Sequence, residues 1–344
     1  MTERPRSLAR LHVFALTTAV ALGALILMGG FVTASHSGLG CGTEWPLCRG
    51  QLTPPLGHFH AWMEGLHRLL ALIASLGVLG LFLSSLPSRL AGWPGSETLR
   101  RIAYAAAGLI LLEVVLGMVT VLFDLPAWVI GLHMADAGLI LGLVLSYTRL
   151  TGALATDTTI RDLNALKKVR AVSAMSSTSS LPVRDLTGLG GLVSTRRLYV
   201  LAAILAVLSA ALGSYVTHSH SAASCVTGRF ACVGDVGTPL GAGLPIVAVH
   251  VLAALMLGVI LLLAIRQAPK AHSGLLFGLA TGAYLVQILL GLALLWTGLD
   301  PAVLWLHEGV GALVMGLWVT LAIAPDLPVA LAPSQYEAES AATL

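Results

Sequence analysis

The chain has 344 residues, of which 57% are hydrophobic and only 10% are charged. A soluble domain carries about 25% charged residues, so this composition excludes a protein that folds in water alone and predicts one embedded in lipid. The net charge of +3 does not indicate nucleic-acid binding, because the basic residues gather in loops on one side of the predicted membrane spans.

Eight apolar stretches are long enough to cross the hydrocarbon core of a bilayer, which takes roughly 20 helical residues. Each is an unbroken apolar run and not an alternating one, which predicts helices and excludes a β-barrel. We therefore expect an all-α integral membrane protein with eight transmembrane helices. The predicted spans are 14–34, 60–84, 102–122, 128–150, 198–216, 244–266, 275–297 and 302–324.

The lysines and arginines are distributed unevenly between the two sides of these spans. Most lie before the first span, after the second, in the long middle segment or after the sixth, whereas the opposite side carries little more than Arg49 and Arg229. Basic loops stay in the cytoplasm, so we expect both termini there. A cleaved signal peptide is the alternative for the first span, but the apolar run is too long and no small-residue cleavage site precedes a soluble domain.

All four cysteines fall in loops on the predicted outer face: Cys41, Cys48, Cys225 and Cys232. Thiols there meet an oxidising compartment, so two disulfides are allowed. Four free thiols are the alternative, which the regular spacing of the cysteines disfavours.

The two halves of the chain repeat each other. Val32-Thr33 after the first span and Val216-Thr217 after the fifth both lead to a cysteine pair at the same distances. Further along, a glycine precedes a histidine by the same gap in each half, Gly117 before His133 and Gly291 before His307. Because each half holds an even number of spans, both have the same orientation, which indicates a parallel repeat of two four-helix bundles.

The repeat divides the chain into four parts. We expect an N-terminal four-helix half over 1–150, a cytoplasmic linker over 151–197, a C-terminal four-helix half over 198–326 and a disordered cytoplasmic tail over 327–344. The linker is polar and rich in serine and threonine, which is typical of a flexible connector without a packed core.

Four histidines lie within the predicted spans, where each ionisable group costs free energy and calls for an explanation. They belong to spans two, four, six and eight, which all enter from the outer face, and they lie at nearly the same depth. Two neutral imidazoles that face each other across a four-helix bundle can hold haem iron as axial ligands. The four candidates are His67, His133, His250 and His307.

Two other interpretations of these histidines are weaker. A single histidine more commonly makes a hydrogen bond between helices, but four at matched depth and repeat position favour iron ligation. A structural zinc site needs clustered tetrahedral ligands, often thiolates, and the cysteines here lie in loops.

The halves differ in the residues beside these histidines. Glu64 lies three residues before His67, so both side chains project from one helix face, and Arg68 follows directly. Three residues before His250 stands Val247. A carboxyl group beside one histidine pair predicts that chemistry happens there, and that the other pair only ligates iron. The alternative is that Glu64 merely pairs with Arg68 or another cation near the membrane interface.

Other acids in the spans give weaker signals. Glu113 occupies the repeat position of Gln287, which predicts a packing hydrogen bond. Asp136 follows His133 by one turn and is a candidate to orient that imidazole. Glu308 points away from the histidine before it, and we expect it to be solvated near the outer face.

Taken together, these residues resemble the bacterial haem A synthase family, of the type that contains cysteine pairs. The resemblance covers the eight spans, and only the long linker and the two tails fall outside it. Single histidines that open the fourth, sixth and eighth spans contribute to it. Its specific motifs are Cys41-Gly42-Thr43-Glu44-Trp45-Pro46-Leu47-Cys48 and Glu64-Gly65-Leu66-His67-Arg68.

The resemblance implies an oxidoreductase of haem A biosynthesis. It oxidises one ring methyl of haem O to formyl by successive hydroxylations, and the product is haem A for cytochrome oxidase. The substrate haem O binds in the N-terminal half between His67 and His133. A haem B cofactor binds in the C-terminal half between His250 and His307. Glu64 is then the catalytic carboxylate, which places or deprotonates the species that attacks the methyl carbon.

The same resemblance implies a multi-pass protein of the bacterial cytoplasmic membrane, in contact with lipid and with an electron donor of unknown identity. Haem O synthase, the protohaem farnesyltransferase, is a candidate partner. The first cysteine pair acts in redox or haem handling, and the second pair is structural.

Two other functions are open to such a sequence. A dihaem membrane cytochrome that only relays electrons has two similar sites and no catalytic acid, so Glu64 argues against it. A transporter built on a parallel repeat usually has helices broken near the bilayer midplane, whereas the prolines here fall in loops and at helix ends.

Overall fold

The computed structural model describes residues 3–90, 93, 95–171, 195–219, 243–267 and 274–324. In this part of the chain the secondary structure is helical apart from one isolated bridge between Cys48 and Gln51. The helices are α1 (Glu3–Ala34), α2 (Phe59–Ser84), α3 (Pro87–Leu90), α4 (Ser96–Leu122), α5 (Ala127–Ala171), α6 (Thr195–His218), α7 (Gly243–Gln267), α8 (Leu275–Thr297) and α9 (Pro301–Ile323).

Within the described ranges, every helix except the single-turn α3 is long and apolar enough to cross a membrane, which gives eight spans. The all-α membrane fold and its number of spans are therefore confirmed. Large apolar side chains remain exposed along these helices, for example Leu111 at 71% and Leu262 at 61%. Lipid is the solvent that such a surface requires.

Helix ends follow local sequence signals where the structure describes them. Asp300 caps α9 by accepting hydrogen bonds from the backbone N–H groups of Ala302 and Val303, at 2.9 and 3.2 Å, and Pro301 occupies the first turn. Gly298 ends α8 in the left-handed conformation, at φ 71°. Both are standard signals for a helix start and a helix end.

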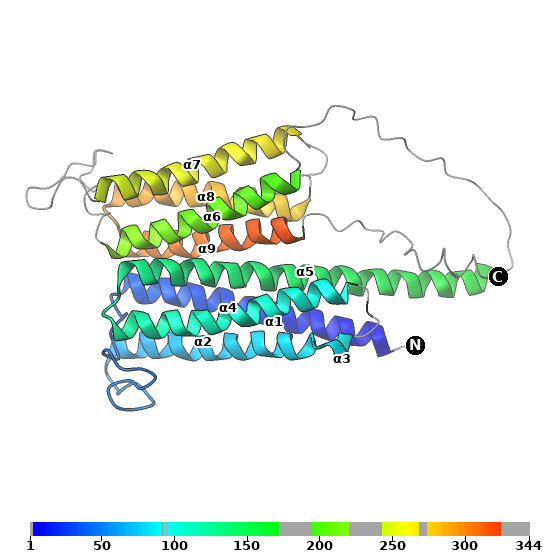
Figure 1. Ribbon diagram of the computed structural model, residues 1–344, viewed down its shortest axis with the longest axis horizontal. Coiled ribbons are helices and arrows are strands. Elements are labelled where there is room, and N and C mark those ends of the chain that lie inside the picture. The colour runs from blue at the N-terminus through cyan, green and yellow to red at the C-terminus, as the bar shows by residue number, and fades with distance from the viewer. Residues whose placement is uncertain are drawn as a thin grey trace, which may run out of the picture.

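Helix α5 continues to Ala171, well into the segment that we expected to be a linker from residue 151 onward. Its membrane-spanning part ends at Ala155, close to the predicted boundary. Loss of hydropathy ends a span but does not end a helix, and no proline interrupts residues 150–171. Figure 1 shows α5 extending past the ends of the other helices.

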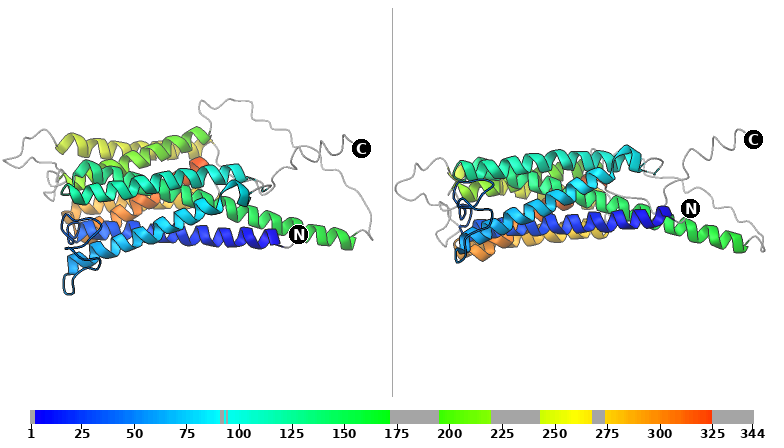
Figure 2. Two further views of the ribbon diagram at one scale, coloured as in Figure 1. Left: turned by 60° about the horizontal axis from the view of Figure 1, so that its bottom comes forward. Right: turned by 90° about the horizontal axis from the view of Figure 1, so that it is seen from below.

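The spanning helices form two groups that lie side by side, α1, α2, α4 and α5 in one and α6 to α9 in the other (Figures 1 and 2). Each group has its own apolar core. This arrangement is compatible with the predicted pair of four-helix halves.

The groups meet where α5 packs on both α9 and α6 and where α1 packs on α9. The α5–α9 contact is the one in which glycines allow the closest approach. Cβ atoms placed on Gly138 and Gly142 would lie 1.7 Å from Met315 Cε and 2.5 Å from Val319 Cβ, so only glycine allows this approach. The Thr320 hydroxyl also donates to the Gly142 carbonyl at 3.3 Å. Small residues four apart are a common way for membrane helices to pack closely.

Candidate functional site

The four predicted histidines lie near the starts of α2, α5, α7 and α9, and these helices all begin at the same end of the bundle (Figure 1). The loop that carries Cys41 and Cys48 lies at this end, which we call the disulfide end. The structure therefore places His67, His133, His250 and His307 at similar depth.

Each of these imidazoles packs against a glycine of a neighbouring helix. A Cβ atom placed on the glycine would lie close to the ring Cε1 atom in every case, which means that a larger side chain would displace the ring. The distances are 3.1 Å for Gly29 and His67, 3.3 Å for Gly117 and His133, 2.8 Å for Gly213 and His250, and 3.2 Å for Gly291 and His307. We call these four positions the cradle glycines.

The histidines come together in two pairs, one in each helix group. His67 and His133 are close enough for their charges to interact, and so are His250 and His307. In the first group, α2 and α5 pack mainly on α1 and α4 and lie across the bundle from each other. Two imidazoles that face each other from such helices suit the axial positions of a haem iron.

The ring nitrogens of the histidines have different partners in the described residues. His250 donates from Nδ1 to the Ser209 carbonyl at 2.8 Å, which leaves its Nε2 atom as an acceptor or metal ligand. The buried Nδ1 atoms of His67 and His307 make no regular hydrogen bond. Imidazoles with an unsatisfied nitrogen in an apolar bundle, each beside a glycine, fit a bulky iron-bearing ring better than they fit simple helix packing.

Glu64 is 3% exposed and both of its carboxylate oxygens accept hydrogen bonds. Oε2 accepts from the backbone N–H of Cys41 at 2.8 Å, and Oε1 forms an ion pair with Arg68. The pairing with Arg68 that the sequence offered as an alternative is thus present. His67 is one turn further along α2, so Glu64 and this member of the first histidine pair share one end of the helix.

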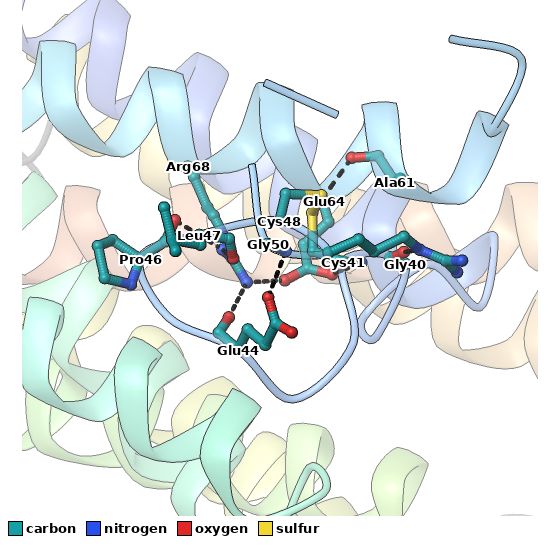
Figure 3. Close-up of a disulfide and its surroundings, with 11 residues drawn as sticks. Gly40, Cys41, Glu44, Pro46, Leu47, Cys48, Gly50, Ala61, Glu64 and Arg68 are labelled. Atoms are coloured by element: carbon teal, nitrogen blue, oxygen red, sulfur yellow. Dashed lines mark hydrogen bonds and ion pairs between the residues drawn. A yellow bond between two sulfur atoms is a disulfide. The ribbon is translucent and has the colours of Figure 1, made fainter. Parts of the chain in front are cut away.

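Arg68 ties the loop at the disulfide end to α2. Its guanidinium donates to the carbonyl groups of Leu47, Glu44 and Pro46, at 2.8, 3.0 and 3.1 Å. Figure 3 shows the guanidinium between this loop and Glu64. Five donors in a planar fork allow one arginine to make this set of contacts.

The loop itself is closed by a disulfide between Cys41 and Cys48, as the cysteine spacing allowed. Both cysteines are buried, at 0% and 3% exposure. Figure 3 shows the disulfide next to Glu64. Cys41, one of the two bridged cysteines, donates its backbone N–H to the Glu64 carboxylate. The predicted pair Cys225 and Cys232 lies outside the described residues.

Glu113 lies against a candidate ligand, which the sequence did not indicate. Its Oε2 atom is 3.2 Å from His133 Nδ1, an ion-pair distance although the geometry is not that of a regular hydrogen bond. Asp136, the expected partner of His133, lies beside Glu113 and is 5% exposed. The acid in contact with the ring is therefore Glu113, because α4 packs on α5 and presents this side chain to the ring.

The carboxylate oxygens of Glu308 are buried, although the residue as a whole is only half-buried, contrary to the expectation that it is solvated. Neither of its oxygens has a hydrogen-bond partner among the described residues. A Cβ atom placed on Gly30 of α1 would lie 3.3 Å from Oε2. The reason is that α9 packs on α1 as well as on α5, so the helix face that carries Glu308 is covered by the other half.

Comparisons with known proteins agree with the motifs. Residues 12–61 match the family of cytochrome oxidase assembly proteins. A heme A synthase of Methylobacterium sp. is 37% identical over 43% of this chain and 44% of its own length. A heme A synthase of Symbiobacterium thermophilum is 30% identical over 65% of this chain and 63% of its own length.

A further similarity is to a protoheme IX farnesyltransferase of Thermus thermophilus, which is 40% identical over 20% of this chain and 11% of its own length. The chain thus spans between about two fifths and two thirds of the length of the heme A synthases that it matches. These similarities agree with the resemblance that the cysteine and histidine motifs predicted: over the matched parts, the chain is similar to heme A synthases.

Proposed function

We propose that the chain is a haem A synthase, an enzyme that oxidises one ring methyl of haem O to formyl. Each hydroxylation oxidises the methyl carbon by two electrons, and loss of water from the doubly hydroxylated carbon leaves the formyl group. The observation that carries the proposal is the buried Glu64 carboxylate one turn from His67, in only one of two otherwise similar histidine pairs.

The first pair, His67 and His133, would hold the iron of haem O. Their position on helices across the bundle and their cradle glycines Gly29 and Gly117 support this assignment. Two imidazoles from helices across the bundle would hold the bound substrate in one orientation relative to α2. Such fixed positioning of the reacting group is a large part of what an active site contributes.

Glu64 would then accept a hydrogen bond from the species that attacks the methyl carbon. Its two oxygens already accept from Cys41 and Arg68, but each carboxylate oxygen retains a further acceptor position. These donors hold the carboxylate in one place, as a group that positions or deprotonates an attacking species requires. Their geometry supports a catalytic role in addition to the ion pair.

The second pair, His250 and His307, would hold haem B. Bound there, haem B would supply one-electron chemistry and conduct electrons away from or toward the reacting site. No acid stands at the position that matches Glu64, where the chain has Val247. The missing acid at this position suits a centre that only exchanges electrons.

We also propose that the protein lies in the bacterial cell membrane with both termini in the cytoplasm. The excess of lysine and arginine on one side of the spans supports this orientation. The disulfide then lies on the oxidising side, where such bonds persist. A protohaem farnesyltransferase is the partner that would supply haem O, and similarity to one such protein supports a functional link.

The test is to express the chain in a host that lacks haem A, with and without a supply of haem O, and to separate the extracted haems by chromatography. Haem A should appear only when haem O is supplied and should disappear in Glu64→Ala. The two matched histidine pairs also favour a dihaem electron-transfer cytochrome. Purified protein with haem B alone under both conditions would support that function instead.

A further inference from the structure

Two repeat-related residues contact histidines in different ways. Glu113 in α4 and Gln287 in α8 each lie four residues before a cradle glycine. Glu113 Oε2 approaches His133 at Nδ1, whereas the Gln287 side-chain amide approaches His307 at Nε2, and both distances are 3.2 Å. The same position of the repeat therefore contacts a candidate ligand in both halves. The contacting group is the Glu113 carboxylate in the first half and the Gln287 amide in the second.

Glu113 contacts His133 in a part of the bundle from which water is largely excluded. Glu113 is 8% exposed, and Asp136 beside it is 5% exposed. Neither Glu113 Oε2 nor His133 Nδ1 makes a regular hydrogen bond with any other group that the structure describes. Asp136 Oδ2 also lacks a regular hydrogen bond among the described residues, but of the two carboxyl groups it is Glu113 that lies within ion-pair distance of the ring. Since an unpaired polar atom is costly in an apolar bundle, Glu113 Oε2 is the available acceptor for His133 Nδ1.

An acceptor at Nδ1 has a specific consequence for an imidazole. It holds the ring proton on Nδ1, leaves Nε2 free to ligate a metal and fixes the rotation of the ring. A carboxylate is a stronger acceptor than an amide, so it also makes the imidazole a better electron donor. The Gln287 amide contacts the other ring nitrogen and cannot act on His307 in this way.

We propose that Glu113 is a positioning residue for His133, and that it makes the iron of the N-terminal site harder to reduce than the iron of the C-terminal site. The proposal rests on the proposed function, because it requires haem iron on His133. It extends that function because it attributes the difference in reduction potential between the two sites to Glu113 in α4. This residue lies outside the segment of α2 that carries Glu64 and His67.

The experiment uses the purified full-length protein, with haem B as the added probe. Haem binding is titrated by absorbance, and the midpoint potential of each bound haem is measured by redox titration. The haem signal that is lost in His133→Ala defines the N-terminal site. None of these measurements requires turnover.

Glu113→Leu should weaken haem binding at the N-terminal site by about 10-fold or more, as loss of such a partner does for other metal sites. It should raise the midpoint potential of that haem and leave the other haem unchanged. Glu113→Gln keeps the shape and an acceptor oxygen, so it should retain most of the affinity while the potential still rises. This second variant keeps the test valid if the leucine variant folds poorly.

Asp136→Asn is the control for loss of a nearby charge alone, because Asp136 lies beside Glu113 but forms no ion pair with the ring. Its effect on the potential should be clearly smaller than that of Glu113→Gln. Equal shifts in these two variants, or unchanged affinity and potential in Glu113→Leu, would overturn the positioning role and leave the proposed function intact. A haem signal that is unaffected by His133→Ala would overturn both.

Discussion

In the first half of the chain, His67 follows Glu64 by one turn and His133 has Glu113 against its ring, whereas Val247 and Gln287 hold the matching positions of the second half. The cradle glycines are the same in both halves. Under the proposed function, the comparison separates two requirements: a glycine and a histidine on neighbouring helices would hold the macrocycle, and the added acids would determine what is done to it.

The largest expected effect is at Glu64. Glu64→Ala should lower haem A production by at least about 100-fold, the usual contribution of a positioned acid or base, while both haems stay bound. The iron ligands are untouched, and Arg68 keeps its three carbonyl partners in the loop. The measurement is haem A and total haem per mole of purified protein.

Glu97→Ala is a suitable control for this variant, because Glu97 forms the same kind of ion pair with Arg101 four residues later, in α4 and exposed. It should leave haem A production unchanged. A Glu64 variant with normal haem A yield would remove the main distinction between the two histidine pairs.

The second prediction concerns the half that has Val247 at the position matching Glu64. His250→Ala or His307→Ala should remove the low-spin haem B spectrum in cells that make no haem O. The reason is that, in the proposed function, each histidine would supply one of two ligands to the same iron, and either loss would leave the haem with a single protein ligand. Survival of that spectrum in both single variants would mean that haem B is bound elsewhere.

The third prediction uses the cradle glycines to compare the two halves. Gly213→Ala should displace His250, since its Cβ atom would lie 2.8 Å from the ring, at a cost of about 1–3 kcal/mol for overpacking. The matching variant Gly29→Ala should act more weakly on His67, because the distance there is 3.1 Å. Haem occupancy of each site is the measurement.

Gly278→Ala in α8 serves as the control, because nothing lies within 4 Å of the added Cβ atom. Alanine there should be neutral or slightly stabilising, as alanine favours helix over glycine. If all three variants reduced haem occupancy equally, the cradle glycines would have no special relation to the histidines.

The spans and the candidate ligands could be predicted because they depend on hydropathy and on residue type alone. Each predicted span has a counterpart in the structure, with ends that differ by at most seven residues. The contact of Glu113 with His133 and the burial of Glu308 could not be predicted, because both depend on how neighbouring helices are rotated. Gly29 and Gly213 stand at matching positions of the repeat. The sequence therefore showed that the two glycines correspond, but only the packed helices show that each one contacts a histidine ring.

The smallest expected effects concern the two cysteine pairs, which we predict are not equivalent. Each pair would close a loop of similar length, worth about 2 kcal/mol by chain entropy. The bond between Cys41 and Cys48 has an additional role, because the backbone N–H of Cys41 donates to Glu64 at 2.8 Å. Cys41→Ala or Cys48→Ala should therefore lower haem A output several-fold with little loss of folded protein.

The second pair, Cys225 and Cys232, precedes a helix with no acid beside its histidine. Cys225→Ala or Cys232→Ala should lower the amount or the melting temperature of the protein and leave haem A per folded molecule largely unchanged. Reduction with a mild thiol supplies a second comparison in the unmodified protein: activity should fall in step with the opening of the first disulfide. The measurements are haem A per unit of folded protein and a melting assay for the four variants. Equal losses of specific activity for both pairs, or none for the first, would show that the contact between the disulfide loop and Glu64 has no functional consequence.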